Sequence, residues 1–178
     1  MKIIQHLKEN QSPTRSPTNQ THQTQIQTKT QRVLDKLFLL GRQGGYPIAL
    51  EGALKVKEVS YLHAEGYPGG ALKHGPFALI EDGVPIILLA FQDEWQQKIH
   101  ITAQEVKSRG AIVYLITDLE DEAIPAGLYD MVIKISQSRY LTPLLSILPL
   151  QYLAYQLTIA LNYNPDYPRN LAKCVTTE

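Results

Sequence analysis

The stretch PIILLA at Pro85–Ala90 and the stretch AIVYLIT at Ala111–Thr117 decide the fold. Both are short, continuous apolar runs, which are typical of strands that are covered on both faces. The segment between them, from about Asp93 to Ser108, has the length and the periodicity of a helix. Strand, helix and strand in succession predict a βαβ unit, in which the two strands lie parallel.

Further segments extend this unit in both directions. The run LFLL at Leu37–Leu40 and the run at Met131–Ile135 predict two more strands, and a periodic stretch from Pro47 to about His63 predicts a helix. Continuous apolar strands alternating with helices are typical of a parallel sheet with helices on both faces. We therefore expect an α/β domain with three layers.

The segment Leu144–Leu161 is apolar over a length that approaches that of a membrane span. Pro149, Gln151 and Gln156 interrupt it, so a long helix buried within a domain is the better interpretation. No transmembrane segment is expected.

The first part of the chain differs in composition from the rest. Between Gln11 and Gln31 almost every residue is Gln, Thr, Ser, Pro or Asn, and such a segment buries too little apolar surface to offset the entropy of ordering it. The sequence predicts a disordered tail over residues 1–31 and one folded domain over residues 32–178.

Charge and cysteine content exclude several classes of function. The 178 residues include 17 Lys and Arg against 17 Asp and Glu, which gives no basic surface for nucleic acid or for an anionic membrane. A single cysteine, Cys174, excludes an intramolecular disulfide framework and a cysteine-rich zinc site. The single cysteine and the absence of a secretory signal pattern at the N-terminus favour the cytoplasm as the location of the protein.

Glu51, Lys55 and Glu58 follow one another at helical spacing, so their side chains project from one side of the expected helix. One interpretation is a solvated ladder of ion pairs, which is common on exposed helices. The other is a functional site, and the neighbouring sequence favours it.

Two polar segments elsewhere in the sequence carry further candidate site residues. HAEGYPGGALKHGPFALI, which begins at His63, is rich in Gly and Pro and carries Lys73 and His74, so we expect a loop that presents side chains. In open α/β sheets such sites lie beyond the carboxyl ends of the strands. The C-terminal segment NPDYPRNLAKCVTTE groups Arg169, Asn170 and Lys173, although chain ends are often disordered.

Three motifs in order, YPIALEGALKVKEVSYLHAEGY, LKHGP and PRNLAK, resemble the second sugar-isomerase (SIS) domain of glutamine:fructose-6-phosphate aminotransferases, also called glucosamine-6-phosphate synthases. The resemblance covers the chain from about Leu37 to its last residue. It implies a flavodoxin-like fold with a five-stranded parallel sheet. It also implies an enzyme that converts fructose 6-phosphate and ammonia to glucosamine 6-phosphate without a metal or other cofactor.

The same resemblance assigns roles to residues. It implies that Glu58 moves a proton between adjacent sugar carbons and that Lys55 lies beside it. It also implies that His74 assists opening of the sugar ring in the pocket of a neighbouring subunit, so the chain is expected to form a homodimer. Lys173 would form a Schiff base with the open-chain ketone, in a C-terminal active-site tail over residues 164–178. The substrate-binding residues that it implies are Glu51, Arg169, Asn170 and Ala172.

Departures from the family pattern leave three readings of the function open. Met1 is followed by Lys2 rather than by the family's catalytic cysteine, and no Ser/Thr-rich phosphate loop of a first isomerase domain is present; Ser136–Ser138 resembles only its opening. Gln43 and Ala71 replace a typical glycine and glutamate. One reading is that the chain is half of an aminotransferase, either a fragment of a longer gene or a subunit that a separate chain completes with a glutaminase and a first isomerase domain. Otherwise it is a non-catalytic module that binds sugar phosphates or dimerises, or an independent isomerase or deaminase, which no residue favours.

Overall fold

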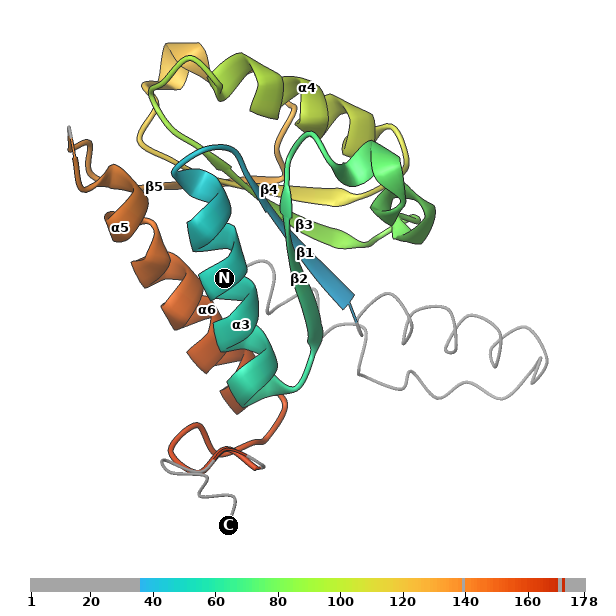
Figure 1. The fold of residues 1–178 in the computed structure, drawn as a ribbon, viewed down its shortest axis with the longest axis vertical. Helices are drawn as coiled ribbons and strands as arrows, with labels where there is room; N and C mark the ends of the chain where they lie inside the picture. The colour runs from blue at the N-terminus through green and yellow to red at the C-terminus, as the bar shows by residue number, and fades with distance from the viewer. Residues whose placement is uncertain (1–35, 139, 170, 172–178) are drawn as a thin grey trace, which may run out of the picture.

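A computed structural model describes residues 36–138, 140–169 and 171. Five parallel strands form one sheet in the order β2-β1-β3-β4-β5 (Figure 1). This is the strand order of flavodoxin-like folds, the fold that the resemblance implied. The strands are β1 (Lys36–Gly41), β2 (His63–Pro68), β3 (Pro85–Ala90), β4 (Ile112–Thr117) and β5 (Met131–Lys134).

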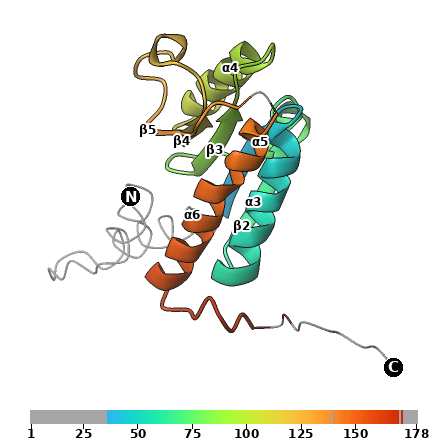
Figure 2. The ribbon, with the colours of Figure 1, turned by 90° about the vertical axis from the view of Figure 1, so that its left-hand side faces the viewer.

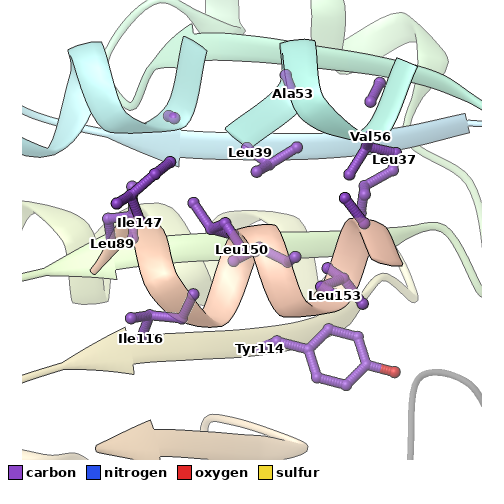
Figure 3. Close-up of a cluster of buried hydrophobic side chains, with 14 of the residues drawn as sticks. Leu37, Leu39, Ala53, Val56, Leu89, Tyr114, Ile116, Ile147, Leu150 and Leu153 are labelled. Atoms are coloured by element: carbon purple, nitrogen blue, oxygen red, sulfur yellow. The ribbon is translucent and has the colours of Figure 1, made fainter. Parts of the chain in front are cut away.

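One face of the sheet is covered by the helices α3 (Gly45–Ser60), α5 (Thr142–Leu145) and α6 (Ile147–Ala160). Figures 1 and 2 show α3 and α6 side by side along the sheet. Figure 3 shows Ala53 and Val56 of α3 and Leu150 of α6 directed toward the strand residues that they bury. The strand residues on this face include Leu37, Leu39, Leu89, Tyr114 and Ile116.

The other face is covered by α4 (Gln96–Lys107) and by short 3-10 helices, η1 (Leu72–His74), η2 (Pro76–Leu79) and η3 (Asp121–Ala123). Here the alternate strand residues form a second core with α4, among them Phe38, Leu40, Ile86, Leu88 and Leu115. Because successive strand residues are buried on opposite faces, the continuous apolar runs belong to strands covered on both sides, and the predicted three layers are confirmed.

Glycines let α3 approach its neighbours closely. A Cβ added at Gly52 would lie 2.5 Å from a Leu150 side-chain carbon of α6. A Cβ added at Gly66 of β2 would lie 2.8 Å from the backbone of Leu50 in α3. Both distances are shorter than van der Waals contact, so a larger residue at either position requires the packed elements to move apart.

Two predictions about the first half of the chain were wrong. The helix predicted to run to His63 ends at Ser60, because Tyr61 adopts a left-handed backbone conformation with φ of 61°. The segment that follows, predicted as a loop from its Gly and Pro content, contains β2. β2 pairs with β1 over six residues, and its own sequence is neither apolar nor alternating.

The later helices differ from their predictions in extent. α4 begins at Gln96 rather than near Asp93, because the Asp93 carboxylate accepts the Trp95 backbone N–H at 2.8 Å and forms a turn there. The long helix predicted over Leu144–Leu161 is divided at Ser146 into α5 and α6. Within the described residues no helix has both the length and the apolarity that a membrane crossing needs. The tail predicted over residues 1–31 lies outside them.

Candidate active site

The α3 side chains singled out in the sequence do form one connected group. The Lys55 ammonium lies 2.7 Å from a Glu58 carboxylate oxygen and 3.6 Å from a Glu51 carboxylate oxygen. Their exposed side-chain fractions are 28% for Glu58, 32% for Lys55 and 45% for Glu51. The group is therefore a ladder of ion pairs, as one interpretation held, but it is partly shielded from solvent.

This geometry fixes the charge of Lys55. The hydrogen bond to Glu58 raises the pKa of Lys55. Burial opposes this with a smaller effect, and the charges of Glu58 and Glu51 raise the pKa further. Lys55 therefore stays protonated near neutral pH and acts as a fixed cation beside Glu58. In such a pair the carboxylate is the group that can accept a proton.

Residues of the C-terminal segment return to the end of α3. The Arg169 backbone N–H donates a hydrogen bond to the Tyr61 hydroxyl at 2.8 Å, and the Arg169 guanidinium carbon lies 3.9 Å from the centre of the Tyr61 ring. Tyr163 packs edge-to-face against Tyr61 and is also close to Arg169. Tyr61 follows directly on α3, three residues after Glu58, so the tail meets the helix that carries the ion pairs. Asn170, Ala172 and Lys173 lie outside the described residues.

His74 does not join this group within one chain. It is an exposed residue of η1, which packs on the α4 face through Leu72, and its neighbour Lys73 pairs with Glu105 of α4 at 2.5 Å. Glu58 lies on α3, on the opposite face of the sheet. The two residues therefore belong to elements on opposite faces of the sheet.

Glu58 also lies away from the edge where the sequence placed the site. α3 starts after the carboxyl end of β1 and leads into the amino end of β2, so Glu58 near its last turn lies toward the amino ends of the strands. The ion-paired group of α3 therefore lies at the other edge of the sheet from the one at which sites of open α/β sheets are generally expected.

The segment Ser136–Ser138 is not arranged as a phosphate loop. The Ser138 backbone N–H donates to the Thr142 hydroxyl oxygen at 2.9 Å, and that hydroxyl donates to Asp118 at 3.1 Å. An amide that is already paired, beside a carboxylate, is poorly suited to hold an anion. Among the described residues no group of three or more His, Cys, Asp or Glu could hold a metal ion.

Gln43 lies in the turn between β1 and α3, where the sequence departs from a typical glycine. Its backbone φ is 46°, in the left-handed region that glycine adopts most easily. The turn is tight, because the Gly45 N–H donates to the Arg42 carbonyl at 2.8 Å. The chain thus keeps the glycine-type turn with a less suitable residue.

Sequence reasoning missed two features of this surface. One is the pair Tyr61 and Tyr163, which holds Arg169; a cluster of tyrosines around the tail was the only available signal. The other is a pocket of about 370 Å³ between β5 and the β4–β5 connection, whose lining includes Tyr129 and Lys134. None of the predicted site residues that the structure describes lines this pocket.

Comparisons with known proteins agree with this architecture. A family model described as the SIS domain matches residues 32–161. The chain is 49% identical over 142 residues to a glutamine–fructose-6-phosphate aminotransferase (isomerizing) of Methanosarcina acetivorans, covering 79% of this chain and 23% of that protein. It is 44% identical over 153 residues to the aminotransferase of Thermus thermophilus, which covers 86% of this chain and 25% of that protein. The chain thus spans about a quarter of the length of these relatives.

Solved structures show the same relationship. The C-terminal domain of the Francisella tularensis aminotransferase matches with a TM-score of 0.70 and 29% identity, covering 85% of this chain and 49% of that one. A glucosamine-6-phosphate deaminase from Thermotoga maritima matches with a TM-score of 0.63 and 26% identity, covering 81% and 41%. A tagatose-6-phosphate ketose/aldose isomerase from Escherichia coli shares the fold alone, with a TM-score of 0.61 and 21% identity, covering 83% and 43%.

Proposed function

The chain belongs to the SIS domain family, and from this premise we propose that it is the sugar-phosphate isomerising part of a glutamine:fructose-6-phosphate aminotransferase. In that role it binds fructose 6-phosphate in the cytoplasm and helps to convert it, with ammonia, to glucosamine 6-phosphate. The observation that carries the proposal is the half-buried Lys55–Glu58 pair, next to which Tyr61 holds the C-terminal segment at Arg169.

Glu58 is the proton acceptor in this proposal. Its carboxylate takes a proton from one sugar carbon and returns it to the adjacent carbon, a task that suits a positioned carboxylate. Lys55 remains cationic because the hydrogen bond to Glu58 raises its pKa, so it can orient Glu58 and stabilise negative charge that develops on the sugar oxygen. Glu51 holds Lys55 from the opposite side.

Lys173 is the amine that reacts with the sugar. Its nitrogen attacks the open-chain C2 carbonyl, and loss of water gives an imine, which requires a deprotonated amine. In this proposal positive charge from Arg169 or Lys55 favours that form. Asn170 and Ala172 bind the sugar beside it, and His74 of a neighbouring subunit assists ring opening, in agreement with its position on the opposite face of its own sheet.

A further part, on the same longer chain or on a separate polypeptide, completes the reaction in this proposal. It supplies a glutaminase, as the source of ammonia, and a first isomerase domain, as the holder of the phosphate. One observation favours a second candidate, a non-catalytic module that binds sugar phosphates: the Ser138 amide is paired within the chain, so this segment offers no phosphate nest of its own.

The test is borohydride trapping of the purified chain with millimolar fructose 6-phosphate, followed by mass spectrometry of the peptide that contains Lys173. We expect reduction of the imine to a stable secondary amine at Lys173, which is lost in Lys173→Ala and retained in Lys57→Ala, a change at an exposed lysine of α3. Folded protein without an adduct contradicts Schiff-base chemistry by this chain. Saturable binding of the sugar in that case supports the second candidate.

A further inference from the structure

Tyr61 occupies the point where α3 ends and the chain turns toward β2. Its backbone φ is 61°, in the left-handed region, and its N–H donates to the Lys57 carbonyl at 3.3 Å. Glycine is the usual residue at this position of a helix end, because a side chain in the left-handed region costs free energy. The turn alone therefore does not favour a tyrosine, and its side chain needs a separate explanation.

The side chain of Tyr61 makes two kinds of contact with the C-terminal segment. Its hydroxyl accepts the Arg169 backbone N–H at 2.8 Å, and the centre of its ring lies 3.9 Å from the Arg169 guanidinium carbon. The Tyr163 ring packs edge-to-face on the Tyr61 ring, with 4.8 Å between the ring centres. The hydrogen bond fixes the backbone of the segment, and the cation–π contact orients the guanidinium. Together they hold Arg169 at one place relative to α3.

The segment between α6 and Arg169 is shaped to reach that place. Asn162 has a φ of 60°, and the Tyr163 N–H donates at 3.0 Å to a carbonyl of the last turn of α6, which turns the chain away from the helix axis. The Asn164 side chain then forms a turn with the backbone N–H two residues later, at 2.9 Å. Figure 1 shows the segment passing the end of α3. These turns are local, whereas the contact of Arg169 with Tyr61 joins residues 108 positions apart and sets where the segment lies.

We propose that Tyr61 is a positioning residue for the reaction of Lys173, an inference that rests on the proposed function. Arg169 precedes Lys173 by four residues, and Tyr61 follows Glu58 by three. The contact therefore brings the chain that leads to Lys173 close to the turn of α3 that carries Glu58. Tyr61 itself takes no part in proton transfer or in imine formation.

The length of free chain sets the size of the effect. With Arg169 held, four residues lead to Lys173, and they reach at most about 14 Å when extended. Without that contact the nearest helix end is Ala160 of α6, thirteen residues before Lys173. The effective concentration of a tethered group falls with about the −3/2 power of the tether length, so release from Tyr61 lowers it about 6-fold.

The rate of borohydride trapping, measured on the whole chain over a range of fructose 6-phosphate concentrations, tests the proposal. We expect the limiting rate of adduct formation at Lys173 to fall about 3-fold in Tyr61→Phe, which removes one hydrogen bond, and at least about 6-fold in Tyr61→Leu, which also removes the ring. The final amount of adduct should equal that of the wild type, because a misplaced amine slows the reaction whereas partial unfolding lowers the amount of protein that reacts. The matched control is Tyr152→Phe, which removes the hydroxyl of a 57% exposed tyrosine of α6 and leaves the rate unchanged.

Amide hydrogen exchange provides a second measurement, which needs no sugar. The peptide that contains Arg169 should exchange faster in Tyr61→Phe than in the wild type or in Tyr152→Phe, because its N–H loses the Tyr61 hydroxyl as acceptor. Equal trapping rates in the wild type and in Tyr61→Leu overturn the positioning role alone, and so does a control that slows the reaction as much as Tyr61→Phe. A wild type that forms no adduct contradicts the proposed function and this role with it, so the two failures are distinguishable.

Discussion

The helices α3 and α6 lie side by side on one face of the sheet, yet their outward sides differ in kind. α3 carries Glu51, Lys55 and Glu58, which are ion-paired and partly shielded. α6 has no charged residue and directs Leu148 and Tyr152 outward. The inward sides of both helices cover the same core, so the two helices differ mainly in the charge of their outward sides.

The difference indicates a division of roles between the two helices. Partly burying charged groups costs free energy unless they are well paired, and leaving large apolar side chains in water favours association. A surface under no functional constraint would avoid both. We therefore interpret the outward side of α3 as a site for chemistry and compare it with the uncharged outward side of α6.

The largest expected effect is on chemistry and comes from α3. If Glu58 transfers the sugar proton, Glu58→Gln lowers the rate at which a carbon-bound hydrogen of fructose 6-phosphate exchanges with deuterated solvent by about 10²- to 10⁴-fold. The free energy of unfolding should change by less than about 1 kcal/mol, because the group is partly exposed. Mass spectrometry of the sugar measures the exchange. Glu94→Gln, at an exposed residue outside α3, is the control, and equal exchange in both variants would exclude Glu58 as the base.

The next effect is on stability and comes from α6. Leu150→Ala removes a fully buried side chain between α3 and the sheet, so we expect a loss of about 3 kcal/mol in the free energy of unfolding. Leu148→Ala, two residues earlier on the outward side, should change it by less than about 0.5 kcal/mol in the monomer. Urea denaturation of the two variants at low protein concentration makes the comparison. Similar losses would mean that Leu148 belongs to the core as much as Leu150 does.

A smaller effect concerns how α3 is held against β2. Gly66→Ala introduces a Cβ that meets the Leu50 backbone at 2.8 Å, and backbone atoms cannot rotate away, so we expect a loss of about 2 kcal/mol. Gly69→Ala is the control, because the nearest atom to its Cβ would be the end of the Ile99 side chain, at 3.2 Å. Thermal melting compares them. If the two variants melt alike, the close approach of α3 to β2 is not what limits residue size at Gly66.

The fold could be predicted in large part because most strands carry a strong local signal. Pro85–Ala90 was identified to the residue, since a strand buried on both faces must be continuously apolar. β2 could not be found this way. It is an edge strand with the sequence HAEGYP, and its backbone pairing with β1, together with the close contact of Gly66 with α3, determines its conformation. Both contacts join residues that are far apart in the sequence, so a short stretch of sequence does not reveal them.

The candidate site shows a similar limit. Helical spacing alone predicted that Glu51, Lys55 and Glu58 share one side of α3, and the ion pairs agree. Spacing could not separate Glu58 from His74, which are close in sequence, because it does not say that the chain crosses the sheet between them. Nor could it bring Arg169 to Tyr61, a contact that depends on the direction of α6.

The smallest effect concerns α4, which directs a titratable group inward on the other face of the sheet. His100 is 8% exposed, and its Nδ1 lies 2.6 Å from the Tyr129 hydroxyl oxygen. Burial lowers the pKa of His100 below its ordinary value of 6.5, with a partial offset from the Ala123 backbone. Between the lowered pKa and 6.5 the unfolded chain binds more protons than the folded chain. The contribution of His100 to stability is therefore complete above pH 6.5 and is lost as the pH falls through the lowered pKa.

His100→Gln tests this directly, because glutamine can still hydrogen-bond to Tyr129 but does not titrate. We expect the free energy of unfolding of the wild type to fall between about pH 8 and about pH 5 by more than that of the variant. Urea denaturation at the two pH values measures the difference. Parallel losses in wild type and variant would show that other groups bind the protons taken up on unfolding. In that case the buried polar group of α4 serves packing alone, and the helices of this fold differ in function only through their outward sides.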